Sequence, residues 1–168
     1  MSLEATRQAL ANHCGCTAVI TALGATCWPL GPTGPVVTVD PYQHTVTATT
    51  TRQRAVVPYQ HPAQACQLAT HIWACDAAIS IAAAADHCGG TVETYGPAAD
   101  SPAAARILGR SVYCRIYHLQ SGAYSLTIEA RRADGSAAIL WDSAGGKPMP
   151  DGIALARALT ETVEADNA

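Results

Sequence analysis

Two long stretches of this chain carry almost no charged side chains. No such residue occurs between positions 8 and 39, and Asp76 is the only one between positions 55 and 85. A soluble domain normally covers its surface with Lys, Arg, Asp and Glu, which are costly to bury. The first half of the chain must therefore be kept from water by contact, either with the second half or with another molecule.

The chain is long enough to form one domain with its own core. It has 168 residues, of which 49% are hydrophobic, and it contains no Phe. Because alanine is the commonest of these hydrophobic residues, many of them bury little area each, and close packing must stabilise the core. We predict a single domain over residues 1–168.

Neither half of the chain is basic. Residues 1–88 contain three basic and four acidic side chains, and residues 89–168 contain seven and nine. Binding to a phosphate backbone depends on clustered Lys and Arg. The one adjacent pair, Arg131 and Arg132, lies between Glu129 and Asp134. The composition therefore disfavours a nucleic-acid partner.

Cysteine usage indicates a reducing environment. An odd number of cysteines in a chain of this size does not resemble a disulfide framework. Reduced cysteine is also a common small core residue. We therefore expect a cytoplasmic protein with seven reduced cysteines: Cys14, Cys16, Cys27, Cys66, Cys75, Cys88 and Cys114.

Two apolar segments raise the question of a membrane. Residues 68–85 have roughly the length of a membrane span, but they include Asp76, which is costly to place at mid-membrane. Residues 17–25 have the composition of a signal sequence core, but Glu4 and Arg7 leave no positive segment before it. We interpret the first as a buried helix and the second as part of a buried strand, and expect no membrane partner.

The periodicity of hydrophobic residues and the positions of glycine and proline predict an α+β fold with antiparallel sheets and a long central helix. Helices are expected over residues 2–12, 62–88 and 103–108, with a last one beginning at Asp151. Strands are expected over residues 16–24, 36–39, 44–51, 53–59, 91–95, 111–119, 124–132 and 137–142. The last helix carries acidic residues at its end, which oppose the helix dipole, so we expect that end to fray.

Three surfaces follow from these patterns. In the long helix, Leu68, Ile72, Cys75 and Ile79 form a stripe, and the opposite side is also apolar, so the helix is buried or shared with a partner. In the strand over residues 44–51, the residues Thr45, Thr47 and Thr49 lie on one face. In the strand over residues 124–132, we expect Leu126, Ile128 and Ala130 to face the core and Thr127, Glu129 and Arg131 to face water.

The order of elements suggests an internal duplication. Residues 45–52 align without a gap to residues 125–132, and residues 55–57 then match 138–140. Each pair leads through proline to a helix. We hypothesise that residues 1–90 and 100–168 are two αβββα-like halves within the single domain.

One set of residues has the chemistry of a metal site. Thiolate and imidazole ligands together suit zinc, and such groups occur at His13, Cys14, Cys16, His87 and Cys88. Structural zinc sites usually show Cys-x-x-Cys pairs, however, and nothing in the sequence brings residues 14 and 88 together. We therefore assign no metal, and keep a Cys/His metal-binding or thiol-dependent protein as the alternative function.

No catalytic or cofactor motif emerges elsewhere. His71 and Cys75 are four residues apart, but a thiol nucleophile needs a base and a lowered pKa that the sequence does not show. The glycine-containing loops over residues 30–35 and 144–148 lack the phosphate-binding pattern. Asp86, His87 and Glu93 are polar residues near a helix end. We assign no catalytic residue and no cofactor, and favour a non-enzymatic role.

The function that the sequence favours is association with protein. The uncharged N-terminal half would supply the contact surface, through the helix around Trp73 or through the threonine strand. A homo-oligomer is the simplest version, because one self-complementary patch suffices. A subunit of a larger viral or cellular assembly is a second version. A small-molecule binder would rest only on Trp28, Trp73 and Trp141.

Overall fold

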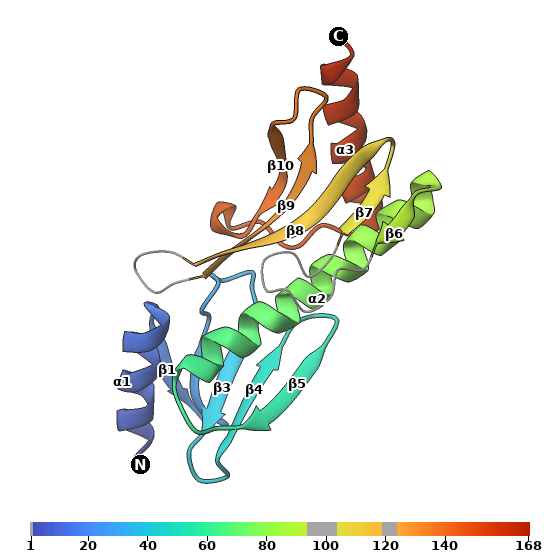
Figure 1. The fold of residues 1–168 in the computed structure, drawn as a ribbon. Coiled ribbons are helices and arrows are strands. Elements are labelled where there is room, and N and C mark those ends of the chain that lie inside the picture. Colours follow the sequence, from blue (N-terminus) through green and yellow to red (C-terminus); the bar gives the residue numbers. More distant parts are fainter. Residues whose placement is uncertain (1, 94–103, 119–123) are drawn as a thin grey trace. The chain divides into compact units, whose positions relative to one another are not determined.

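The computed structural model describes residues 2–93, 104–118 and 124–168 (Figure 1). Two antiparallel five-stranded sheets and three α-helices confirm the predicted α+β class with a long helix. The first sheet has the order β1-β2-β3-β4-β5 and the second the order β10-β9-β8-β7-β6. The elements are α1 (Leu3–Cys14), β1 (Ala18–Thr21), β2 (Gly24–Cys27), β3 (Val36–Asp40), β4 (Thr45–Thr49), β5 (Arg54–Pro58), α2 (Ala63–Cys88), β6 (Thr91–Glu93), β7 (Ala104–Ile107), β8 (Arg110–His118), β9 (Tyr124–Arg131), β10 (Ala137–Asp142), the 3-10 helix η1 (Ser143–Gly145) and α3 (Gly152–Asp166).

The chain divides into two compact units. Unit 1 comprises Met1–Trp73 and His118–Ser125, and unit 2 comprises Ala74–Tyr117 and Leu126–Ala168. The two segments that align in the sequence, β4 and β9, are each the fourth strand of their sheet in chain order. Each fourth strand pairs with a fifth strand that precedes a helix. The hypothesis of two duplicated halves is consistent with this order and stays a prediction.

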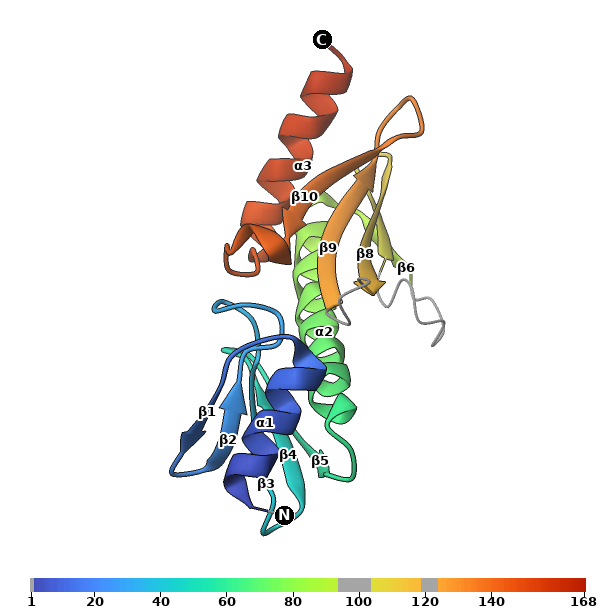
Figure 2. The same cartoon turned by 90° about the vertical axis from the view of Figure 1, so that its left-hand side faces the viewer.

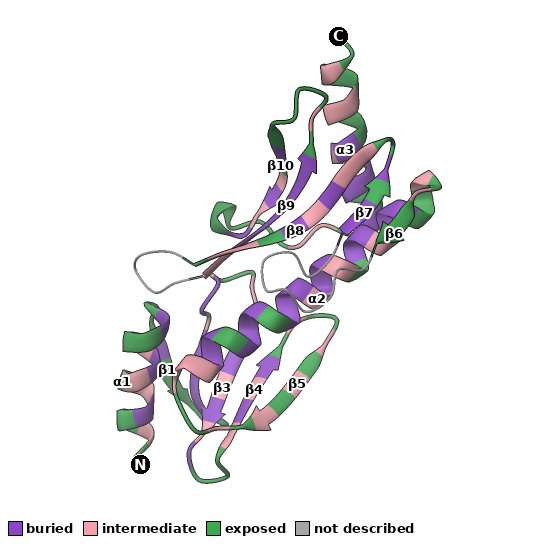
Figure 3. Cartoon of the chain, in the orientation of Figure 1, coloured by how far each residue is buried: buried purple, intermediate pink, exposed green. Residues whose placement is uncertain are grey.

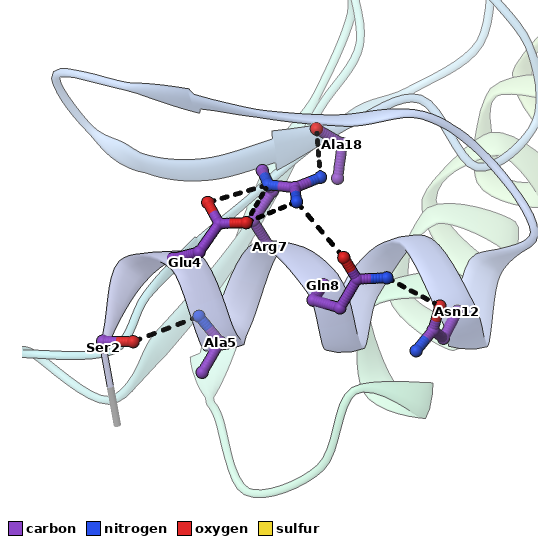
Figure 4. Close-up of polar contacts among 7 residues, drawn as sticks. All are labelled: Ser2, Glu4, Ala5, Arg7, Gln8, Asn12 and Ala18. Carbon is purple, nitrogen blue, oxygen red and sulfur yellow. Dashed lines mark hydrogen bonds and ion pairs between the residues drawn. The ribbon is translucent and has the colours of Figure 1, made fainter.

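In unit 1, helix α1 was predicted over residues 2–12 and runs from Leu3 to Cys14, two residues beyond the predicted end. The Ser2 hydroxyl accepts a hydrogen bond from the backbone N–H of Ala5 at 3.1 Å, and Gly15 ends the helix with a φ of 60°. Figure 4 shows the polar contacts along its surface. The Arg7 guanidinium bonds the Glu4 carboxylate and donates to the Ala18 carbonyl at 3.4 Å, which ties α1 to β1.

The first predicted strand is two strands joined by a tight turn. Residues 16–24 were expected to run straight, but β1 ends at Thr21 and β2 begins at Gly24. Gly24 has a φ of 138°, and a Cβ atom there would lie 2.9 Å from the Val39 carbonyl carbon. Only glycine allows this close approach of two backbones. The hairpin adds a strand to the sheet that the sequence pattern did not resolve.

In unit 2, a strand replaces the helix predicted over residues 103–108. Residues 104–107 form β7, which pairs with both β6 and β8. The turn from β7 to β8 places Leu108 at a φ of 50° and Gly109 at 72°, the conformation of a tight hairpin turn. Strand pairing on both sides overrides the helix propensity of the two alanines in this segment.

The last helix is anchored at the end that we expected to fray. Helix α3 runs alongside β10 in both views of Figures 1 and 2 and extends to Asp166. The Asp166 carboxylate lies 3.4 Å from Arg110 and 3.2 Å from Arg132, and it accepts from the Ala133 N–H at 3.1 Å. Two cations and a backbone donor outweigh the unfavourable helix dipole.

Helix α2 is buried over most of its surface, as its composition predicts (Figure 3). By length and composition alone it could cross a membrane, but 61% of its apolar 18-residue stretch is buried within the structure. The predicted stripe holds for Leu68 and Ile72 but is wrong beyond them, since Ile79 is 47% exposed. From Asp76 onward the buried positions are Asp76, Ala77, Ser80, Ile81, Ala84 and Ala85. Small side chains make up most of the buried face there, so large side chains alone do not mark it.

The contact between α3 and α2 within unit 2 predicts a sharp sensitivity at Gly152. A Cβ atom there would meet the Cβ of Ala83 and lie 2.8 Å from its carbonyl carbon. We expect Gly152→Ala to lower the free energy of unfolding by about 1–3 kcal/mol, because the two helices must separate. Gly145→Ala is the matched control, since no atom lies within 4 Å of its Cβ position. Equal unfolding curves for the two variants in urea would contradict this packing.

Candidate functional site

The outer face of the first sheet is a surface of aligned threonines. Strand register places one row straight across the five strands: Val19, Thr26, Thr38, Thr47 and Val56. The neighbouring rows add Val36, Thr49 and Arg54 on one side and Asp40, Thr45 and Pro58 on the other. We call this surface, made of these residues, the threonine face. The residues between them in sequence, such as Val37 and Val46, are fully buried on the inner face.

Hydroxyl groups on the threonine face bond one another. The Thr26 hydroxyl lies 2.9 Å from that of Thr38 and 3.2 Å from that of Thr21. Thr21 in turn donates to the Gly24 carbonyl at 3.2 Å. This chain of bonds runs across β1, β2 and β3. The hydroxyls of Thr21, Thr26 and Thr38 therefore already have partners within the protein.

The threonine face is hollowed into a groove of about 700 Å³. Thr45, Thr47 and Thr49 all line it, as their alternation in the sequence predicts. Of the described residues that line the groove, Asp40 and Arg54 are the charged ones. They lie in the two outer rows, on opposite sides of the middle row. The Asp40 carboxylate also accepts from the backbone N–H groups of the following turn. Most of the groove is therefore uncharged but rich in hydroxyl and methyl groups.

The tryptophan that the sequence offered as a contact residue is not available for contact. Trp73 is 2% exposed, and its ring lies 3.1 Å from where a Cβ on Gly34 would be. Trp141 is buried as well, and its indole N–H donates to the Lys147 carbonyl at 3.1 Å. Leu23, at the tip of the β1–β2 hairpin and 76% exposed, borders the groove instead. A large side chain thus reaches the surface through a turn that the sequence did not reveal.

Two of the predicted metal ligands, Cys14 and His13, make other contacts in the structure. Cys14 forms a disulfide with Cys66, so the expectation of seven reduced cysteines is wrong for this pair. The end of α1 and the first turns of α2 bring the two Cα atoms to 5.9 Å, which sequence spacing could not show. His13 packs its ring edge-on against His61, with centroids 5.1 Å apart. The expected cytoplasmic location stays a prediction.

The other predicted ligands do not complete a metal site. His87 and Cys88 lie at the end of α2 and line a hollow of about 290 Å³ in unit 2, together with Arg157 and Leu108. Among the residues that the structure describes, no three His, Cys, Asp or Glu side chains come together as a metal site would require. The metal-binding form of the alternative function thus has no assembled ligand set in the described chain.

The remaining thiols differ in their acidity. Burial and the charge of Asp76 raise the pKa of Cys75, so this residue is a poor nucleophile. Burial also raises the pKa of Cys114 to about 12. Cys16 differs, because a hydrogen bond from Cys27 lowers its pKa to about 7 despite partial burial. Of the described thiols with a shifted pKa, Cys16 alone is made more acidic.

A polar cluster in unit 2 escaped the sequence analysis. Glu129 and Thr127 were expected to face water, but they are only 2% and 3% exposed. The Glu129 carboxylate accepts hydrogen bonds from Thr127 at 2.6 Å, Tyr117 at 2.9 Å and Tyr113 at 3.3 Å. Thr127 lies on the same strand as Glu129, but Tyr113 and Tyr117 lie on the neighbouring strand β8, and alternation within one strand contains no trace of these two donors.

Comparison with known proteins finds no relative of this chain. Neither a protein-family model, nor a curated protein, nor a solved structure matches the chain. The candidate sites are therefore judged on their own geometry. Two features of the described residues stand out by that standard: the threonine face, which is hollow and mostly uncharged, and the pair Cys16 and Cys27.

The Glu129 cluster predicts a measurable loss of stability when one donor is removed. Tyr117→Phe deletes the 2.9 Å hydrogen bond to a buried carboxylate and keeps the ring. We expect the free energy of unfolding to fall by about 1–2 kcal/mol in a urea titration. Tyr42→Phe is the control, because Tyr42 is 70% exposed, and its effect should stay within about 0.5 kcal/mol. Equal effects would show that Tyr117 does not stabilise Glu129.

Proposed function

We propose that this protein is a non-enzymatic protein-interaction protein whose docking surface is the threonine face. The observation that carries the proposal is the near absence of charge across three adjacent rows of an otherwise solvent-facing sheet surface. An antiparallel sheet with one wet face usually alternates apolar residues inside with charged and polar residues outside. Here the outer positions hold mainly threonine and valine, and Asp40 and Arg54 are the charged residues among them.

The hydroxyl network lowers the cost of docking. Burying an unpaired hydroxyl costs on the order of 1–3 kcal/mol, because its bond to water is lost. Thr21, Thr26 and Thr38 already bond within the sheet, so a partner can cover them without that loss. The flanking valines, Val19 and Val56, are 40% and 47% exposed and supply the apolar contact. A partner surface can therefore be apolar and need not match a pattern of donors.

The size of the face favours a transient interface. Five strands spaced about 4.8 Å apart and five residues of length give a surface of roughly 300 Å². A stable complex buries about 800 Å² on each partner. The face alone is smaller than that, so even with the Leu23 hairpin at its border we expect association at micromolar rather than nanomolar concentration.

A second copy of the chain is the simplest partner. In a two-fold symmetric pair, the same patch serves both copies, and a suitable axis brings Asp40 of each copy opposite Arg54 of the other. Both residues lie on the threonine face and come from opposite end rows. Two such ion pairs at the rim would fix the orientation, while the threonine rows would form the centre.

The proposal predicts that a charge at the centre of the face weakens self-association. Thr47→Lys places an ammonium group in the middle row, where it would be buried without a partner, and should weaken dimerisation at least about tenfold. Thr51→Lys is the matched control, because Thr51 is exposed in the turn after β4 and does not line the groove. Sedimentation equilibrium over a series of micromolar concentrations measures both.

Two results would contradict the proposal in different ways. A wild-type protein that stays monomeric at the highest concentration would exclude self-association and leave only an external protein partner. A dimer that Thr47→Lys leaves intact, with unchanged circular dichroism, would show that association uses another surface. A charge-reversed Asp40→Arg variant restored by Arg54→Asp would confirm the predicted orientation.

A further inference from the structure

Cys16 and Cys27 lie side by side in unit 1. Cys27 is the last residue of β2 and faces Ala18 of β1 across the hairpin. Cys16 lies two residues before Ala18, in the segment that follows α1. The hairpin thus folds the two cysteines back on each other, and their sulfur atoms share a hydrogen bond. Neither belongs to the Cys14–Cys66 disulfide.

We propose that Cys16 and Cys27 form a dithiol site that reduces small-molecule disulfides and closes into a second disulfide bridge. Two thiols that share a hydrogen bond need only a small movement to bond. Cys27 is fully buried, whereas Cys16 is only partly buried, so a disulfide in solution can reach only Cys16. The site therefore has one accessible sulfur and one protected sulfur, the arrangement of an attacking and a resolving cysteine.

The surroundings of Cys16 favour its thiolate. The Cys27 thiol and the backbone N–H of Trp28 both donate hydrogen bonds to the Cys16 sulfur, and together they lower its pKa to about 7. Below that pH the thiol holds its proton and reacts slowly; above it the thiolate predominates. An attacking thiol is most effective when its pKa lies near the ambient pH, which is the case here at neutrality.

The reaction proceeds in two exchange steps. The Cys16 thiolate attacks one sulfur of the small disulfide, a bond forms between them, and the other half leaves as a thiolate. Cys27 then attacks the Cys16 sulfur, expels the second half as a thiolate and forms the Cys16–Cys27 bond. The protons of the two cysteines go to the two leaving thiolates. The protein loses two electrons, and the small disulfide gains them and becomes two thiols.

Cys27 becomes reactive only after the first step. The hydrogen bond to Cys16 is the main cause of its raised pKa, with burial second. Once Cys16 is bonded to a foreign sulfur, it no longer carries a negative charge. The main force that holds the proton on Cys27 is then gone, and the second exchange can follow. The order of the steps is thus built into the pair.

The test uses the full chain and oxidised glutathione at neutral pH. The five free thiols should fall by two, and peptide mapping by mass spectrometry should find Cys16 joined to Cys27. Cys27→Ala should stop after the first step and accumulate glutathione on Cys16. Cys75→Ala is the control, because Cys75 is partly buried like Cys16 but has a raised pKa, and it should react like the wild type.

A second measurement separates a special site from an ordinary exposed thiol. The rate of Cys16 alkylation by iodoacetamide should rise through a midpoint near pH 7, and Cys27→Ala should move the midpoint to higher pH because a donor is lost. Three outcomes would overturn the proposal. They are a Cys16 that reacts no faster than Cys75 at neutral pH, a wild-type protein that stops at glutathionylated Cys16, and a new bridge from Cys16 to Cys14 or Cys66.

Discussion

The burial of helix α2 is the constraint on which the rest of the structure depends. The helix has 26 residues, of which only Asp76 and Asp86 carry a carboxylate and none is Lys or Arg, so few of its side chains are favourably solvated by water. Both units use it: Leu68 and Ile72 are core residues of the first, and Ile81 and Ala84 are core residues of the second. Because alanine buries little area, this helix is stable only where neighbouring elements approach closely. Gly152 permits such an approach in unit 2, where a single methyl group would collide with Ala83.

Two carboxylates that lie in buried or partly buried positions, Glu129 and Asp166, each have several hydrogen-bond or ion-pair partners. Glu129 has three hydroxyl donors, and Asp166 has two arginines and a backbone N–H. Burying a carboxylate costs several kcal/mol unless hydrogen bonds compensate it. Apart from Thr127, these partners come from other elements, so each of the two carboxylates also fixes how those elements are arranged. Such groups act as specific links in a core that is otherwise made of small apolar side chains.

Sequence reasoning succeeded where a local period decided the structure. The alternation in residues 44–51 placed the threonines on one face, and the run of alanine and apolar residues identified the long helix. It failed where the decision was not local. The helix expected over residues 103–108 is strand β7, because pairing with β6 and β8 outweighs alanine propensity. Glu129 was placed in water because the tyrosines that cover it lie on a neighbouring strand.

The candidate sites, too, could be predicted where a local pattern decided them and not where distant segments meet. The threonine face could be anticipated from β4 alone, but its extent depends on a cross-strand register that joins residues up to 37 positions apart, Val19 and Val56. The contact of Cys16 with Cys27 depends on the hairpin turn at Gly24, which a strand predicted over residues 16–24 conceals. A metal site at Cys14 was plausible only as long as its disulfide with Cys66 was unknown.

The two proposed activities meet on strand β2. Because successive side chains of a strand point to opposite faces, Thr26 belongs to the threonine face and Cys27 to the inner side. A Cys16–Cys27 bridge would join the segment after α1 to the end of this strand, one residue from a hydroxyl that bonds both Thr21 and Thr38. Oxidation would therefore restrain the part of the sheet that carries the centre of the docking surface. Since Thr26 is itself 5% exposed and its bonds lie within the sheet, this restraint would preserve the geometry of the face and would not remodel it.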